Sequence, residues 1–431
     1  MGDTANPVLN EPVLSCRFSP AAFLLTALQQ VFVTADTIPA PNPRYPVFMP
    51  TEEIVIAEST ANSTHPAGSI PGCAAARAIV EQAVADRAFP GAAFGVLHQD
   101  RIVALDAAGR FTYEENAPAV QPATVFDLAS VSKVVATTAA AMLLHARGVF
   151  DLDARLGDIL PGFVVGMEPG SGKERVTLRT LLAHSSGLPG YVKLFETCTS
   201  ADALLRAALQ LPLEAKPAAR TEYSDPGFIL LGKVIEVLAG QSLDAYCAHE
   251  IFAPLGLTAT RFRPRASALS VIPPTEEDKT FRRRVIQGEV QDENACVLGG
   301  VAGHAGVFSN VPDMLAFAKC ILDRGRAASG QPLFQPETLN LFATPQTTLD
   351  GNTRALGWDV PTPPSSSGRH FGPHSIGHLG YSGTSLWIDR DQALAVVLLT
   401  NRTWPDRSND AIRQVRPAFH DAVVESLRAS A

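Results

Sequence analysis

The sequence is poor in the features that define several common classes of protein. Only 18% of its 431 residues are charged, and their formal net charge is −8 at pH 7. Because no basic stripe with interleaved aromatic residues occurs, we expect no nucleic acid partner. The densest basic cluster, Arg282-Arg283-Arg284, is predicted to be a solvated loop edge. Hydrophobic residues make up 46% of the chain, which is enough to bury a large core and excludes a generally disordered protein.

Cysteine pairs and metal-ligand spacings are also missing. In a chain of this length, cysteines without a Cys-x-x-Cys pair predict neither a disulfide scaffold nor a zinc site. His249-Glu250 has no second histidine four residues after the first, and Gly170–Lys173 lacks the first Walker glycine. His184 and His304 lie in glycine-flanked turns and are predicted to be structural hydrogen-bonding residues. We therefore expect no metal and no cofactor. The six cysteines are Cys16, Cys73, Cys198, Cys247, Cys296 and Cys320.

Long hydrophobic runs are absent near the amino terminus. The apolar stretch 21–33 is interrupted by Gln29-Gln30 and is too short to span a bilayer. We therefore expect a soluble protein without an integral membrane segment. A cytoplasmic location is favoured over a periplasmic or secreted one.

Composition and periodicity divide the chain into an extension and a catalytic unit of two parts. Residues 1–72 are rich in Pro, Thr and Ser and are predicted to be an N-terminal extension. Segments 73–150 and 291–431 contain helices and antiparallel strands, and 151–290 reads as an inserted, mainly helical domain. The predicted helices are 74–88, 178–184, 201–211, 226–239, 312–324 and 410–427, the predicted strands are 92–97, 101–108, 385–389 and 393–400, and 263–294 is predicted to be a long polar loop.

Ser130 begins the most informative stretch of the sequence. An Ala-rich apolar run, 134–146, follows it with a helical pattern and no Gly or Pro before Gly148. Lys133 comes three residues after Ser130, so on a helix both lie on one face. This gives a serine nucleophile an amine within reach, at a helix N-terminus that favours negative charge. Because the helix is predicted to be buried, we expect Lys133 to shift toward the neutral form that a proton acceptor needs. Alone, the Ser-x-x-Lys pattern of Ser130 and Lys133 is a weak signal, and further residues are needed to identify an active site.

Two later clusters are candidates to complete a site with Ser130. Tyr223 lies on a loop just before the helix predicted at Pro226, where a phenol can relay a proton. The alternative is a half-buried core tyrosine. The glycine-rich segment 377–384 leads directly into a predicted strand, where a backbone N–H can donate to an oxyanion. The alternative there is an ordinary turn.

Taken in order, these clusters resemble the serine β-lactamase and penicillin-recognising superfamily. The resemblance extends beyond the triplets to Phe126-Asp127-Leu128-Ala129-Ser130-Val131-Ser132-Lys133, to Leu181-Leu182-Ala183-His184-Ser185-Ser186-Gly187-Leu188-Pro189 and to 299–309. It covers about 73–430 and is greatest to class C β-lactamase-like hydrolases, which include family VIII carboxylesterases and D,D-carboxypeptidase-like proteins. It implies a β-lactamase/transpeptidase-like fold of the α/β (α+β) class: an antiparallel sheet flanked by helices, with an inserted all-helical domain.

The resemblance also implies a role for each matched residue. Ser130 is the acylated nucleophile and Lys133 is its general base. Tyr223 passes the proton to the leaving group and later helps to activate water. The oxyanion hole consists of the backbone N–H groups of Ser130 and Tyr381.

Two substrate-binding positions depart from the pattern of that superfamily. Asp225 stands where a Tyr-x-Asn motif has Asn, and His378, followed by Leu379 and Gly380, stands where Lys-Thr-Gly has Lys. An ionised Asp225 can only accept hydrogen bonds, and a neutral His378 attracts a substrate carboxylate less than a lysine does. Both departures favour uncharged esters over β-lactams and D-alanyl peptides.

The sequence therefore predicts a serine hydrolase that forms an acyl-enzyme with a small carboxylic ester. An amide-directed enzyme with the same residues, either a D,D-carboxypeptidase or a weak β-lactamase, is the nearest alternative. An acyltransferase remains open, and so does a non-catalytic penicillin-binding sensor.

Overall fold

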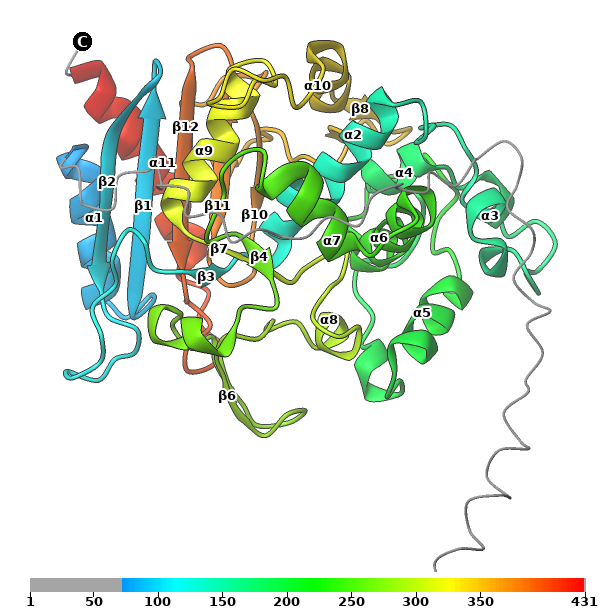
Figure 1. Cartoon of the computed structure of the whole chain (residues 1–431), viewed down its shortest axis with the longest axis horizontal. Helices are drawn as coiled ribbons and strands as arrows, with labels where there is room; N and C mark the ends of the chain where they lie inside the picture. The colour runs from blue at the N-terminus through cyan, green and yellow to red at the C-terminus, as the bar shows by residue number, and fades with distance from the viewer. Residues whose placement is uncertain (1–71, 430–431) are drawn as a thin grey trace, which may run out of the picture. The chain divides into compact units, whose positions relative to one another are not determined.

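Five antiparallel strands form the central sheet, in the spatial order β10-β11-β12-β1-β2. They come from two distant segments of the computed structural model, which describes residues 72–429 (Figure 1). All but the last residue of the predicted N-terminal extension lies outside the described residues, as does the apolar stretch 21–33. The five strands are β1 (Gly91–His98), β2 (Arg101–Gly109), β10 (Ile376–Leu379), β11 (Ser385–Asp389) and β12 (Leu394–Thr400).

Helices cover both faces of this sheet. On one face α1 (Ala74–Ala85) and α11 (Ile412–Ala429) pack together, and α9 (Val311–Leu322) lies on the other (Figure 1). Every residue of β12 is buried, which explains its continuous apolar sequence. A Cβ at Gly95 would lie 2.6 Å from Val311 Cγ1, so only glycine lets α9 approach β1 this closely.

A mainly helical region follows the Ser130 segment in the chain and occupies the other side of the molecule in Figure 1. Its central helix is α6, which is largely buried. Ser224 caps α6 by accepting the N–H of Gly227 at 3.1 Å, and Gly240 ends it in the left-handed conformation. The helices of this region are α3 (Leu156–Ile159), α4 (Leu178–Leu182), α5 (Ala201–Gln210), α6 (Asp225–Ala239) and α7 (Leu243–Cys247).

Shorter elements complete the described part of the chain. A three-stranded sheet in the order β3-β7-β4 lies beside the Ser130 segment. The remaining elements are α8 (Glu293–Val297), α10 (Pro336–Ala343), β3 (Phe126–Asp127), β4 (Arg261–Phe262), β5 (Glu276–Asp278), β6 (Arg284–Ile286), β7 (Val307–Ser309), β8 (Gln346–Thr347) and β9 (Thr353–Arg354).

The mixed α/β architecture and the predicted elements are confirmed, with helix and strand ends within three residues of prediction. Two expectations are wrong. The inserted segment is not all helical, because β4, β5 and β6 lie within it. The segment 263–294, which was predicted to be a long polar loop, also contains strands β5 and β6, which pair as a hairpin.

Arg282 corrects a further expectation, since its side chain is only 6% exposed rather than solvated. Its guanidinium contacts Asp278 at 3.0 Å and Glu289 at 3.1 Å. Asp278 also accepts backbone N–H groups from Thr280 and Phe281. These bonds supply the partners that let a charged side chain be buried.

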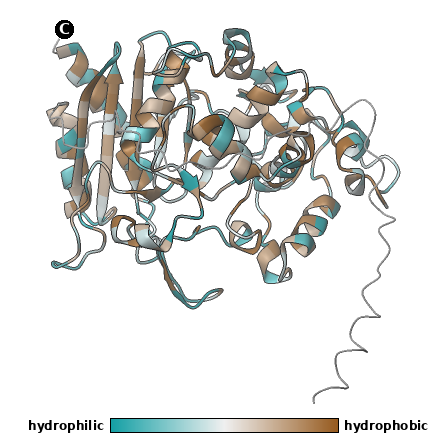
Figure 2. Cartoon of the chain, in the orientation of Figure 1, coloured by the Kyte–Doolittle hydropathy of each residue, from teal (hydrophilic) through white to brown (hydrophobic). Residues whose placement is uncertain are grey.

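Hydrophobic residues run along the sheet strands and through the helices, as the brown colouring of Figure 2 shows. Among the described residues, one helical stretch, Ala129–Ala146, is long and apolar enough to cross a membrane. Within this fold 83% of that stretch is buried, and it carries Ser130. It is therefore a core helix of this fold.

Candidate active site

Ser130 lies on a tight turn that follows β3 and is held by the carboxylate of Asp127. This carboxylate accepts the N–H groups of Ala129 and Gln291, both at 2.8 Å. Ala129 has a left-handed φ of 47°, which costs a non-glycine residue roughly 1–2 kcal/mol. Burial raises the pKa of Asp127 to about 6, although the two N–H donors oppose this rise. The fixed turn places Ser130 at the edge of a cavity.

The helix that begins at Ser130 is irregular, whereas the sequence predicts a regular one. Residues Ala129–Val131 form a 3₁₀ turn, Lys133–Thr138 form a π-helix, and the regular helix α2 runs only from Ala139 to Ala146. Thr137 Oγ1 donates to the carbonyl of Gly303 at 2.7 Å, so this segment is anchored to its neighbour. Such π-segments are frequent at functional sites.

Lys133 points from this segment to Ser130. Its Nζ lies 3.0 Å from Ser130 Oγ, 2.6 Å from Asp225 Oδ1 and 3.0 Å from the carbonyl oxygen of His304. An ammonium group has three N–H donors, and three acceptors surround it here. The side chain is fully buried, so water does not compete with these contacts.

The protonation expected for Lys133 is wrong in direction. Burial alone lowers the pKa of this lysine, as the sequence argument assumed, but the negative charge of Asp225 and the phenol of Tyr223 outweigh burial and raise it. From the sequence, Asp225 was expected to face the substrate, and its contact with Lys133 was not expected.

Tyr223 lies on the loop before α6 and faces Lys133. Lys133 Nζ is 4.9 Å from the centre of the tyrosine ring. The ring of His184 lies 4.6 Å from it between centroids, and the guanidinium of Arg354 lies 5.3 Å from its centre. Burial raises the pKa of Tyr223, Lys133 opposes this, and Asp225 adds to it. The phenol is therefore a proton donor at neutral pH.

The turn after β10 is bonded to the Ser130 turn. Ser382 Oγ donates to the carbonyl of Asp127 at 2.7 Å, and Thr384 Oγ1 donates to the carbonyl of Leu128 at 2.9 Å. A Cβ at Gly380 would lie 1.9 Å from Thr384 Oγ1, so this close approach requires glycine. These bonds join the two turns, and Ser130 and Tyr381 both line the cavity, so an oxyanion hole formed by their backbone N–H groups stays a prediction.

His378 does not line the cavity beside Ser130, whereas Asp225 does. It is 2% exposed, its Nδ1 donates to the carbonyl of Leu379 at 2.8 Å, and its ring lies 5.9 Å from that of Tyr223. Burial, followed by the charges of Lys133 and Arg354, holds its pKa well below 6.5. The imidazole is therefore neutral, and it is buried next to the Tyr223 ring.

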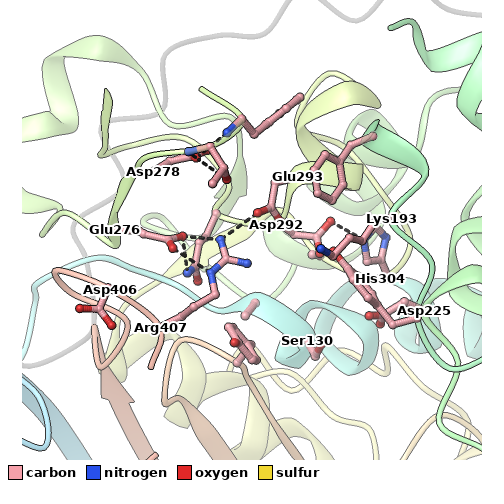
Figure 3. Close-up of a pocket in the computed structure, with 18 of the residues that line it drawn as sticks. Ser130, Lys193, Asp225, Glu276, Asp278, Asp292, Glu293, His304, Asp406 and Arg407 are labelled. Atoms are coloured by element: carbon pink, nitrogen blue, oxygen red, sulfur yellow. Dashed lines mark hydrogen bonds and ion pairs between the residues drawn. The ribbon is translucent and has the colours of Figure 1, made fainter. Parts of the chain in front are cut away.

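The cavity beside Ser130 has a volume of about 1270 Å³. Tyr223, Asp225 and Tyr381 line it with Ser130, while His378, Leu379 and Gly380 lie outside its lining. Figure 3 shows that carboxylates and one arginine dominate the wall opposite Ser130.

Arg407 is the centre of this wall and was missed by the sequence analysis. Its Nε lies 2.7 Å from Glu276, and its Nη2 lies 2.8 Å from Glu293 (Figure 3). Tyr191, which is 46% exposed, also lines the cavity. These residues come from strand β5, helix α8 and two loops and lack a shared motif, so no signal in the sequence joins them.

His184 and His304 make structural hydrogen bonds, as expected. His184 Nδ1 accepts the N–H of Ser224 at 2.9 Å, and His304 Nε2 lies 2.8 Å from Asp292. Among residues 72–429, no group of three or more His, Cys, Asp or Glu side chains is arranged to hold a metal ion.

A serine and a buried lysine lie on a helix beside an antiparallel sheet, and a tyrosine from a neighbouring loop faces the lysine. This arrangement defines a serine hydrolase of the β-lactamase/transpeptidase fold. Residues 76–418 match the Beta-lactamase family. The chain therefore belongs to that family.

Named relatives agree with this assignment, and a solved structure has the same fold. The chain is 33% identical to the N-acetylmuramyl-L-alanine amidase of Bacillus subtilis (strain 168), over 73% of this chain and 77% of that protein. It is 34% identical to an Escherichia coli (strain K12) protein named provisionally as a D-alanyl-D-alanine carboxypeptidase, over 65% of this chain and 69% of that protein. The structure of EstCE1, a hydrolase with promiscuous acyltransferase activity, superposes with a TM-score of 0.64 at 22% identity, covering 81% of this chain and 97% of that one.

Proposed function

We propose that the protein hydrolyses carboxylic esters through an acyl-enzyme on Ser130, and that it prefers esters without a nearby carboxylate. The observation that carries this proposal is the position of the Ser130–Lys133 pair beside an acidic cavity. Three cationic side chains and eight carboxylates line that cavity, namely Lys193, Lys279, Arg407, Glu196, Asp225, Glu276, Glu277, Asp278, Asp292, Glu293 and Asp406. Such a wall repels a substrate carboxylate.

The geometry supports the following reaction. Ser130 Oγ attacks the carbonyl carbon of the ester while the amine of Lys133 takes the hydroxyl proton. The backbone N–H groups of Ser130 and Tyr381 stabilise the negative charge on the carbonyl oxygen. The bond from carbon to the alcohol oxygen then breaks, and the Tyr223 phenol supplies that oxygen with a proton. Water attacks the acyl-enzyme by the reverse proton path and releases the acid.

The neutral imidazole of His378 supports the preference for an uncharged substrate. The fixed cation that the Lys-Thr-Gly motif provides for a carboxylate is absent at that position. Arg407 does not replace it, because its guanidinium is already bound to Glu276 and Glu293. A β-lactam or a D-alanyl C-terminus would therefore bring an uncompensated charge into the site.

The test compares kcat/KM for p-nitrophenyl butyrate, nitrocefin and a D-alanyl-D-alanine peptide, with Ser130→Ala as the matched inactive control. We expect the ester to be favoured by at least about 100-fold, which corresponds to about 2.7 kcal/mol of transition-state stabilisation. Equal or greater efficiency on nitrocefin or on the peptide would refute the ester assignment and leave the nucleophile assignment standing.

A second candidate is an amidase acting on the bond between N-acetylmuramic acid and L-alanine. The observation that favours it is the 33% identity with the Bacillus subtilis amidase. The exposed rings of Tyr191 and Tyr381 on the cavity wall are suited to stacking on a sugar ring. Release of L-alanine from N-acetylmuramyl-L-alanine, faster than hydrolysis of the butyrate ester, would establish this function in place of the first.

A further inference from the structure

Asp225 makes a contact that the sequence analysis did not assign to it. Its Oδ1 lies 2.6 Å from Lys133 Nζ, and its side chain is 15% exposed. Its backbone N–H donates to the carbonyl of Gly190 at 2.9 Å, which fixes the first residue of α6. The carboxylate is therefore directed at the lysine beneath Ser130.

We propose that Asp225 is a positioning residue that holds Lys133 as an ammonium in the resting enzyme, so that acylation requires alkaline pH. The inference rests on the proposed acyl-enzyme reaction, because Lys133 must be a free amine to take the proton from Ser130. In this arrangement the residue at 225 sets the working pH of the enzyme.

Several other titratable or charged groups face Lys133, but none is placed as Asp225 is. Tyr223 carries no charge until its phenol ionises, and the pKa values of His184 and His378 are held well below 6.5 by burial and by neighbouring cations. Asp292 interacts electrostatically with Lys133 and is bound to His304, whose carbonyl oxygen accepts from Lys133. The guanidinium of Arg354 lies over the Tyr223 ring, and its positive charge disfavours a proton on Lys133. Asp225 is therefore the carboxylate in direct contact.

The charge on Asp225 decides which of two opposing effects on Lys133 prevails. Burial of the lysine lowers its pKa, while the carboxylate and the phenol raise it, and the net direction is upward. Asp225→Asn keeps the size of the side chain and an oxygen that accepts from Nζ, but it removes the charge. Burial then prevails, and the free amine is reached at lower pH.

The closing experiment measures the rate at which a fluorophosphonate labels Ser130, together with kcat/KM for p-nitrophenyl butyrate, from pH 6 to 10. The acid limb of kcat/KM reports protonation of the free enzyme, and it belongs to the coupled Lys133–Tyr223 pair rather than to either residue alone. Because the pKa of Lys133 is raised, we expect the wild-type rates to keep rising to the top of this pH range, and those of Asp225→Asn to level off at a pH at least about one unit lower. Asp292→Asn is the matched control, because it neutralises a carboxylate bound to His304 and should move the pH at which the rates level off by less than about a third as much.

The outcomes separate this inference from the proposed function. Equal pH profiles in wild type and Asp225→Asn, with only KM changed, would assign Asp225 to substrate binding and overturn the inference. If Asp225→Asn does not fold, wild-type rates that level off within this pH range overturn the inference just as well. Absence of labelling at Ser130 at every pH would instead overturn the proposed function.

Discussion

Two sets of ion pairs meet the same cavity, and they differ in whether the cation can lose its proton. In the first set, Lys133 and Asp225 are 0% and 15% exposed and lie beside Ser130. Arg407, 36% exposed, binds Glu276 and Glu293, which are 8% and 7% exposed, in the opposite wall. A lysine changes its pKa readily when buried, whereas an arginine stays charged at every relevant pH.

This difference separates a pair that takes part in chemistry from one that shapes the cavity. The Lys133–Asp225 pair touches Ser130 Oγ, so its protonation changes the reaction. The Arg407 pairs join the β5 strand, the α8 helix and the loop after β12, so they fix the wall.

The largest effect is expected for Ser130→Ala, which leaves both ion pairs in place and removes the nucleophile. Loss of a nucleophile that acts with its base as a unit lowers kcat by about 10⁴-fold or more. Mass spectrometry after fluorophosphonate treatment should find one label on the wild type and none on this variant. Ser132→Ala is the control, because its buried Oγ accepts the N–H of Val307 and faces the protein interior. Labelling at Ser132, Ser185 or Ser382 would contradict the assignment.

Removing either group of the proposed proton path, Lys133 or Tyr223, should have the next largest effect. Lys133→Ala and Tyr223→Phe should each lower kcat by roughly 100-fold or more, the usual range for a positioned proton transfer. Because the two residues lie on one proton path, the double variant should lose much less than the product of the single losses. Steady-state kinetics at the pH optimum checks this, and near wild-type kcat in either variant would mean that another group is the base.

The sequence was sufficient for the fold and for placing Lys133 beside Ser130, but not for the protonation state of the lysine. Continuous apolar strands such as β12 and the capped helix α6 follow local rules, and these elements were predicted nearly to the residue. The Ser130–Lys133 contact also follows from local spacing. The Asp225 contact with Lys133 joins residues 92 positions apart, and the Arg407 contact with Glu276 joins residues 131 apart. No local periodicity encodes such distances, so only the assembled fold brings these charges together.

Breaking the second pair should affect stability more than chemistry. Arg407→Ala leaves Glu276 and Glu293 buried without their cation, and we expect a loss of about 1–3 kcal/mol in the free energy of unfolding. The partial exposure of Arg407 keeps this below the loss expected for a wholly buried pair. Urea denaturation measures it, and Arg407→Lys, which keeps the charge but not the two-sided contact, should lose less. A loss in kcat of the size expected for Lys133→Ala, with stability unchanged, would place Arg407 in the chemistry instead.

The smallest effect is expected from removal of metal ions. A divalent cation at this cavity would need carboxylates, and those nearest Ser130 and in the facing wall are already bound to protein cations, namely Asp225 to Lys133 and Glu276 and Glu293 to Arg407. A metal that binds these carboxylates would displace Lys133 from Asp225 or Arg407 from the two glutamates. We therefore expect the hydrolysis rate of p-nitrophenyl butyrate to stay within about twofold after exhaustive dialysis against EDTA. Addition of zinc after dialysis serves as the control, and it should leave the rate unchanged or lower it. Loss of activity by EDTA that zinc restores would mean that a metal, rather than Lys133, activates the nucleophile.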